Sequence, residues 1–111
     1  MATLSSHLLN SVDGTHASGV KVTINQINSL GVKKIFFETE TDPDGRILKD
    51  FKLSNDDCGC DYEMVCKTSD YFFEKKIVSE IIIKFKMEDP KKKYHLPIII
   101  SPNGYSIWWS N

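Results

Sequence analysis

The feature that most constrains this fold is a two-residue alternation of side chains in short segments bounded by turn residues. Residues 20–27 alternate apolar with polar side chains, and residues 78–87 place Ile81, Ile83 and Phe85 on one face. Such alternation is typical of β-strands with one buried face. Asp-Gly at positions 13–14 and Asp-Pro-Asp-Gly at positions 42–45 mark turns between such segments. The pattern predicts a sheet-rich chain with short connections.

Eight strands and one short helix are expected. The predicted strands cover residues 4–10, 20–27, 32–39, 46–51, 61–67, 78–87, 94–101 and 105–110. A short helix is predicted over residues 68–76, because this segment lacks alternation and begins with Thr68 and Ser69, which are good N-cap types. This many strands in 111 residues predicts an all-β, antiparallel eight-stranded sandwich. Residues 1–111 are expected to form a single domain.

The composition argues against two classes of partner. Lys and Arg total 14 against 15 Asp and Glu, so no basic face is indicated and nucleic acid is not expected as a partner. No apolar stretch approaches the ~18–20 residues that span a bilayer, and no secretory leader precedes Leu4. We therefore expect a soluble, cytoplasmic protein without a membrane partner, or a peroxisomal one if a leader has been removed.

Three cysteines lie in one part of the chain, at Cys58, Cys60 and Cys66. The odd count and the Cys-Gly-Cys spacing suit neither a disulfide framework nor the Cys-x-x-Cys pair of zinc sites. We interpret the segment as a turn with reduced thiols and expect no metal. The alternative is a loop metal site that also uses the neighbouring carboxylates of Asp56, Asp57 and Asp61.

Two histidines and an arginine are candidates for general acid–base chemistry. His95 opens an otherwise apolar strand, His7 lies inside the N-terminal strand, and Arg46 ends the Asp-Pro-Asp-Gly turn. Imidazoles titrate near neutral pH, and a guanidinium binds developing negative charge. Taken singly, each residue also has a structural interpretation, as a hydrogen-bonded histidine or a solvated arginine. His16 lies in a turn and is interpreted as a surface residue.

The predicted second face of their sheet is too apolar to be a plain solvent surface. Alternation places His95 on one face with Pro97 and Ile99. His7 lies on the corresponding face of the first strand, and Trp108 on that of the last. An apolar face of this kind is normally covered by another subunit.

Three motifs carry a resemblance to a known family. They are Leu4-Ser5-Ser6-His7-Leu8-Leu9-Asn10, the turn Asp42-x-Asp44-Gly45-Arg46, and Tyr94-His95-Leu96-Pro97 with Ser101-Pro102 and Gly104-Tyr105-Ser106. From Leu4 to its end, the chain resembles the transthyretin-related proteins, and among them the 5-hydroxyisourate hydrolases.

The resemblance implies a transthyretin-like sandwich that assembles as a homotetramer, a dimer of dimers, with active sites in a channel between the dimers. It implies hydrolysis of 5-hydroxyisourate to 2-oxo-4-hydroxy-4-carboxy-5-ureidoimidazoline in urate degradation, a part of purine catabolism, with no cofactor. The implied catalytic residues are His7, Arg46 and His95. The implied substrate-binding residues are His7, Arg46 and Trp108.

The chain departs from the family pattern in three places. Asn10 stands where an aspartate is usual, and His16-Ala17 replaces a Pro-Ala step. The hydrolases end in Tyr-Arg-Gly-Ser, whereas this chain ends in Trp108-Trp109-Ser110-Asn111. The alternative function is therefore a non-catalytic, transthyretin-like carrier or scaffold that binds a small aromatic ligand in the tetramer channel. The hydrolase is favoured because the carriers lack the histidine, arginine, histidine set that this chain retains.

Overall fold

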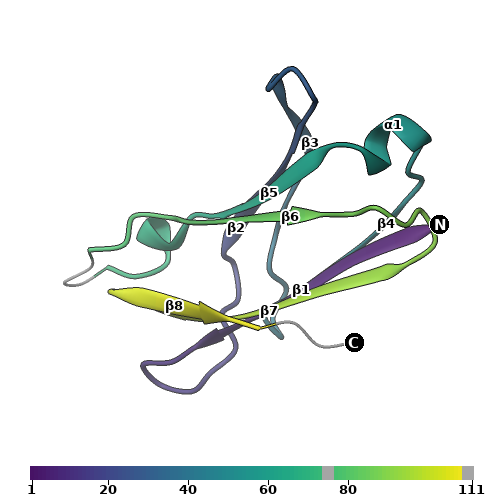
Figure 1. Cartoon of the computed structure of the whole chain (residues 1–111). Helices are drawn as coiled ribbons and strands as arrows, with labels where there is room; N and C mark the ends of the chain where they lie inside the picture. Colours follow the sequence, from purple (N-terminus) through teal and green to yellow (C-terminus); the bar gives the residue numbers. More distant parts are fainter. Residues whose placement is uncertain (74–76, 109–111) are drawn as a thin grey trace.

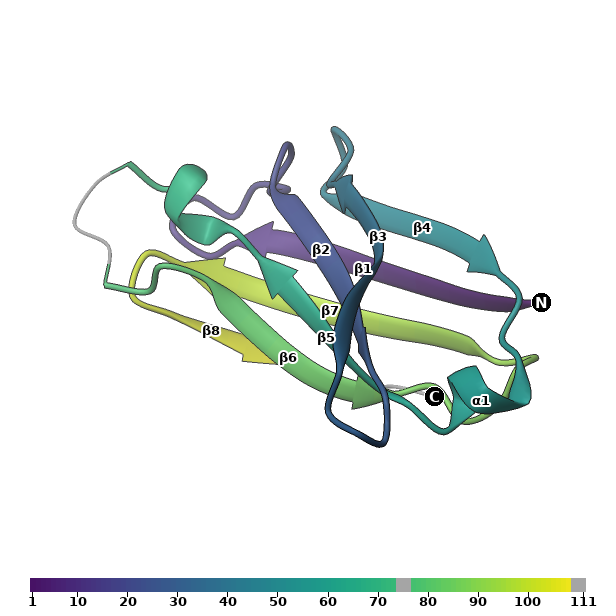
Figure 2. The same ribbon diagram turned by 90° about the horizontal axis from the view of Figure 1, so that it is seen from above.

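Two four-stranded sheets pack face to face in this computed structural model, which describes residues 1–73 and 77–108 (Figure 1). The strands are β1 (Ala2–Asn10), β2 (Lys21–Ile27), β3 (Lys33–Glu40), β4 (Arg46–Phe51), β5 (Asp61–Cys66), β6 (Ile81–Lys86), β7 (Lys93–Ser101) and β8 (Gly104–Ile107). One sheet has the order β4-β1-β7-β8 and the other β3-β2-β5-β6. Figure 2 shows the two layers lying over one another. The predicted eight-stranded β-sandwich is confirmed.

The pairing of β1 with β7 is parallel, which differs from the antiparallel arrangement expected. In this pair Ser5 lies opposite His95, and His7 lies opposite Pro97. Strands joined by a tight turn are antiparallel, but parallel neighbours need a longer crossover connection. Between β1 and β7 the chain forms β2 and β3 of the second sheet, returns to the first sheet as β4, and crosses again to form β5 and β6. Turn signals in the sequence report only local connections, so they could not predict this pair.

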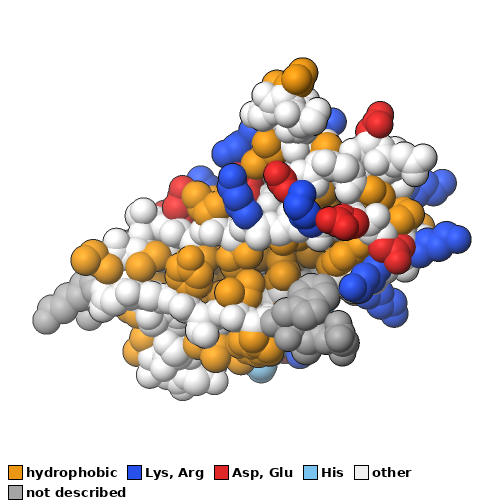
Figure 3. All heavy atoms as spheres, viewed as in Figure 1, with side chains coloured by type: hydrophobic (Ala, Val, Ile, Leu, Met, Phe, Trp, Pro, Cys, Tyr) orange, Lys and Arg blue, Asp and Glu red, His pale blue; other side chains and the backbone are white. Residues whose placement is uncertain are grey.

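Alternation along the strands sends one face of each sheet into the core. In β1 every second residue is buried, from Ala2 through Leu4 and Leu8 to Asn10, and the residues between them are half-buried. Figure 3 shows a band of hydrophobic side chains between the two layers, on the side where β6 and β8 lie. The largest fully buried apolar side chains are those of Leu4, Leu8, Ile24, Tyr62, Met64, Ile81, Met87, Ile98 and Ile100. The outward faces remain free to carry other side chains.

The α-helix lies at a different place from the predicted one. Helix α1 spans Asn55–Cys58, where Ser54 and Asp57 form a capping box in which each side chain accepts from the other's backbone N–H. Within the predicted helix, Thr68–Asp70 forms only a 3₁₀ turn without a side-chain cap. Residues 74–76 of that prediction lie outside the described residues. In the described part of the chain, no helix is long and apolar enough to cross a membrane.

The turn before β4 packs directly against β1. Gly45 has a φ of 71°, and its carbonyl oxygen accepts a hydrogen bond of 2.8 Å from the backbone N–H of Leu8. A Cβ atom at this position would lie 2.5 Å from the carbonyl oxygen of Leu8 and 3.0 Å from the amide nitrogen of Ala17. Glycine is therefore required both by the backbone conformation and by the close approach.

We expect Gly45→Ala to destabilise the fold more than Gly31→Ala. Gly31 also has a positive φ, but nothing lies within 4 Å of its added Cβ. Gly31→Ala is the control. It should lower the free energy of unfolding by only the ~1–2 kcal/mol that a left-handed backbone costs a residue with a Cβ atom. Gly45→Ala should cost a further ~1–3 kcal/mol of the free energy of unfolding, because it overpacks the contact with β1. Urea denaturation of both variants measures the difference, and equal losses would contradict this role of Gly45.

Candidate active site

Strand register brings the three predicted site residues onto one face of one sheet. Arg46 lies opposite His7 in the β4–β1 pair, and His95 lies opposite Ser5 in the β1–β7 pair. The residues that follow Arg46, His7 and His95 in the chain are all buried. Because side chains alternate across a strand, the three site residues point outward. His7 and His95 thus lie on neighbouring strands, with Arg46 beyond His7.

The ring of His95 is held by a serine of the adjacent strand. The Oγ atom of Ser5 lies 2.8 Å from Nδ1 of His95 and 3.4 Å from the carbonyl oxygen of Tyr94. When the hydroxyl donates to that carbonyl, it accepts from Nδ1–H of His95, which leaves a lone pair on Nε2. Ser5 therefore orients the imidazole of His95. Alternation along the first strand already puts Ser5 on the same outward face as His7. Only the parallel pairing of β1 with β7 shows that Ser5 also lies beside His95.

His7 contacts a second imidazole, that of His16, which the sequence predicted only as a surface residue. Its Nε2 atom lies 2.9 Å from Nδ1 of His16, and the ring centroids are 5.1 Å apart. His16 is exposed, as expected for a turn residue. Its contact with His7 was not predicted, because no local periodicity relates residues of a turn to the strand before it.

The pKa of His7 is lowered from its ordinary value of 6.5. Partial burial is the largest cause, and the nearby cations or cation-forming groups of Arg46, His16 and His95 act in the same direction. A hydrogen bond to the backbone of Asp44 opposes them. At neutral pH His7 is therefore an uncharged imidazole, which is the form that can accept a proton.

Arg46 supplies the positive charge of the site. Its backbone is fixed by the turn, since Asp42 Oδ1 accepts from the N–H of Arg46 at 2.9 Å. The salt bridges found among the described residues are Lys33–Glu63 and Lys86–Asp61, so the Arg46 guanidinium is not neutralised by a carboxylate there. It can bind a carbonyl or anionic oxygen through its planar fork of N–H donors. Two imidazoles beside such a group can perform acid–base chemistry on an oxygen-rich substrate.

Trp108 is placed differently from the expectation. Pairing of β8 with β7 ends at Ile107, so Trp108 follows the strand and the predicted alternation does not extend to it. The side chain is 45% exposed and lines a hollow of about 290 Å³ with the core-facing residues Phe85 and Leu96. Its role in substrate binding stays a prediction. Residues 109–111 of the unusual C-terminal segment lie outside the described residues.

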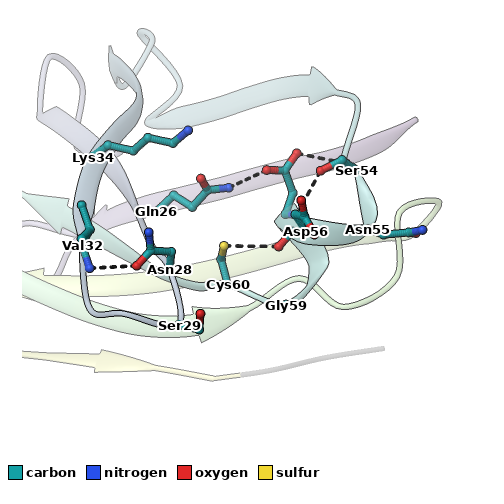
Figure 4. A pocket seen from close by; sticks show the side chains of 11 residues that line it. Gln26, Asn28, Ser29, Val32, Lys34, Ser54, Asn55, Asp56, Gly59 and Cys60 are labelled. Atoms are coloured by element: carbon teal, nitrogen blue, oxygen red, sulfur yellow. Dashed lines mark hydrogen bonds between the residues drawn. The ribbon is translucent and has the colours of Figure 1, made fainter.

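A hollow of about 660 Å³ beside α1 is an alternative location for a functional site (Figure 4). Several of its polar groups are bonded within the fold: Gln26 Nε2 donates to Asp57 at 2.9 Å, and Asn28 Oδ1 accepts from Val32 N–H at 2.9 Å. The Ser54 backbone N–H lowers the pKa of the Asp57 carboxyl. These bonds tie the hollow into the fold, and none of the three predicted site residues lines it.

The three cysteines are free thiols, in agreement with the interpretation as reduced residues. Cys60 donates to the carbonyl oxygen of Asp56 at 3.3 Å, and burial raises the pKa of Cys66 to about 12. Cys58 belongs to α1, and its pKa is also raised by burial. Among the residues that the structure describes, no three His, Cys, Asp or Glu side chains are grouped to hold a metal ion.

Comparison with known proteins decides the family. The family model described as HIUase/Transthyretin matches residues 4–109. The chain belongs to the HIUase/Transthyretin family. Among curated relatives in this family, the 5-hydroxyisourate hydrolase of Salmonella dublin is 33% identical over 108 residues, which cover 95% of this chain and 78% of the relative. The 5-hydroxyisourate hydrolase of Halalkalibacterium halodurans is 29% identical over 112 residues, which cover 95% and 94%.

Solved structures of the family share the fold. The 5-hydroxyisourate hydrolase of Klebsiella pneumoniae superposes with a TM-score of 0.76 at 25% identity, covering 100% of both chains. Transthyretin from Sparus aurata superposes with a TM-score of 0.81 at 21% identity, covering 95% of this chain and 93% of that one. The predicted transthyretin-like fold is therefore confirmed.

We expect His7 to titrate below pH 6.5 in an NMR titration of the imidazole C–H signals. In Arg46→Gln the pKa of His7 should rise, because one of the causes that lower it is removed. Lys49→Gln, on the same strand, is the matched control and should leave the pKa of His7 unchanged. A His7 pKa at or above 6.5 in the unmodified protein would contradict the electrostatic description of the site.

Proposed function

We propose that this chain is a 5-hydroxyisourate hydrolase that opens the six-membered ring of its substrate with water. The product is 2-oxo-4-hydroxy-4-carboxy-5-ureidoimidazoline, and the reaction belongs to urate degradation. The observation that carries the proposal is the register that sets Arg46 opposite His7 and places His95 on the adjoining strand. Relatives named for this activity match 95% of the chain.

The two imidazoles supply the proton transfers that the reaction needs. One neutral imidazole takes a proton from water as the oxygen adds to the ring carbonyl carbon. The carbon–nitrogen bond of the cyclic amide then breaks, and the departing nitrogen takes a proton from the other imidazole. That imidazole enters the step as an imidazolium, with a hydrogen on each nitrogen, and regains its proton from solvent afterwards. Each such transfer typically contributes ~10²–10⁴ in rate. His7 is suited to begin uncharged because its pKa is lowered, and His95 is held in one orientation by Ser5.

Arg46 stabilises the charge that develops between these two transfers. Addition of water turns the carbonyl oxygen into an oxyanion, and the guanidinium can donate two parallel hydrogen bonds to such an oxygen or its neighbours. The position opposite His7 puts this donor fork on the same face as the bases. A carrier or scaffold of the same fold would need no such group beside two imidazoles, so the retained set supports the hydrolase over that alternative.

The same face supports assembly into a homotetramer, a dimer of dimers with the sites in the channel between them. Leu48 is 73% exposed on this face, opposite Ser5, and the half-buried Leu9 and Ile99 pair with each other on the far side of His7. Apolar surface next to an active site is typical of an interface between subunits. Assembly would cover it and exclude water from the imidazoles.

The hydrolase is tested with variants of the three site residues. His7→Ala and His95→Ala should each lower the turnover number by ~10²-fold or more, because each removes a proton-transfer group. Arg46→Lys should also lower it severely, since an ammonium cannot reproduce the planar donor fork. Lys49→Ala, on the same strand as Arg46, is the matched control and should keep full activity.

The measurement is the decay of near-ultraviolet absorbance of 5-hydroxyisourate, freshly made from urate with urate oxidase. Circular dichroism of each variant shows whether the fold is intact. Near-normal turnover in either histidine variant rules out the proposed site, and absence of turnover in the unmodified protein rules out the proposed function.

Assembly is tested by light scattering. The unmodified protein is expected at about four times its 12.7 kDa chain mass. Leu48→Glu should shift the assembly to smaller species, because it puts a charge into the face that we propose is covered. Ile35→Glu is the matched control, since Ile35 is 59% exposed on β3 of the other sheet. A stable monomer at micromolar concentration contradicts the tetramer and the shared channel.

A further inference from the structure

His16 is placed beside the site by a short extension of the β1 pairing. Leu9 and His16 form an antiparallel bridge, closed by hydrogen bonds from Asn10 N–H to Thr15 at 2.8 Å and from Ala17 N–H to Leu8 at 2.9 Å. The other side of β1 is taken by β7 at this level. The bridge therefore continues the edge that β4 occupies as far as His7, and it puts His16 on the outward face.

The contact between the two rings leaves room for one hydrogen. His7 Nε2 and His16 Nδ1 are 2.9 Å apart, which is the length of a hydrogen bond with a single proton between the nitrogens. If both rings were imidazolium, both nitrogens would carry hydrogens that point at each other. The pair can therefore hold at most one additional proton while the contact is intact.

The charge of a singly protonated pair is better placed on His16 than on His7. His16 is exposed, whereas His7 is half-buried. His7 is also faced by the guanidinium of Arg46 from β4 and by the imidazole of His95 from β7.

The charged groups that shift the pKa of His7 are Arg46, His16 and His95, and no carboxylate is among them. The turn before β4 carries Asp42, whose Oδ1 accepts from the backbone N–H groups of Asp44 and Arg46, each at 2.9 Å. Asp44 meets His7 through a backbone hydrogen bond. Water therefore solvates a positive charge better on the exposed ring of His16 than on the ring of His7.

We propose that His16 acts through His7 in the hydrolysis, as a positioning residue that fixes the His7 ring and accepts its proton. The inference rests on the proposed function. Because Nε2 of His7 faces His16, His7 takes the proton at Nδ1. Its Nε2–H then donates to Nδ1 of His16, and transfer across this bond leaves His7 neutral and His16 as the imidazolium. Loss of the Nε2 proton of His16 to water then returns the pair to neutrality. No electrons are exchanged, and the proton leaves through the exposed ring.

The experiment compares two substitutions of His16 by their pH–rate profiles. Asparagine can keep a hydrogen bond from the position of Nδ1 but cannot titrate, whereas alanine removes both. In His16→Asn we expect near-normal kcat/KM at pH 8, with the acid limb moved to higher pH by ~0.5–1 unit, a ~3–10-fold loss at the acid end. In His16→Ala the same shift should be joined by a lower kcat at every pH, because the His7 ring is no longer fixed.

An NMR titration of the histidines without substrate separates this inference from the proposed function. The pKa of His7 should rise in His16→Asn, because His16 is one of the groups that lower it in the unmodified protein. Acid limbs that stay unchanged in both variants, or a His7 titration indifferent to His16, overturn the inference while the hydrolase stands. Absence of hydrolysis in the unmodified protein refutes the function instead, and the NMR result then shows only whether the two rings form a pair.

Discussion

The arrangement of the site depends on the close packing of the Gly45 turn against β1. At that point the carbonyl of Gly45 meets the N–H of Leu8, and there is no space for a side chain. This contact fixes where β4 begins along β1, so that Arg46, its first residue, pairs with His7. The same turn lies against the segment that carries His16. One glycine thus joins three separate stretches of chain, and each of them contributes a group to the site.

The site differs from a pocket in how it is built. His7, Arg46 and His95 lie on the outward face of a sheet, on strands whose spacing and direction are set by backbone hydrogen bonds. A sheet face holds its side chains at defined separations but does not enclose a ligand. Enclosure has to come from something that covers the face, which is why we connect catalysis with assembly.

Strand faces were predictable from the sequence because alternation is a local property. It placed His7 and His95 outward and Leu8 and Leu96 inward, as the structure confirms. The parallel pairing of β1 with β7 was not predictable in this way, because it depends on the route of the chain through the other sheet. Helix α1 had a readable signal in Ser54 and Asp57, but four residues are too few to show helical periodicity. The contact of His16 with His7 required the turn to fold back along β1, which no period in the sequence encodes.

The order of strands in the sheet gives the members of the site unequal local stability. β1 and β7 are inner strands with partners on both sides, whereas β4 lies at an edge. Backbone opening in folded proteins starts where the fewest hydrogen bonds must break, so the amides of β4 should exchange with solvent before those of its neighbours. Fraying of that edge carries Arg46 away and leaves His7 and His95 in register. The group that we propose binds oxygen can thus be lost and regained on its own, while the two histidines that we propose transfer protons stay in place as long as the sandwich does.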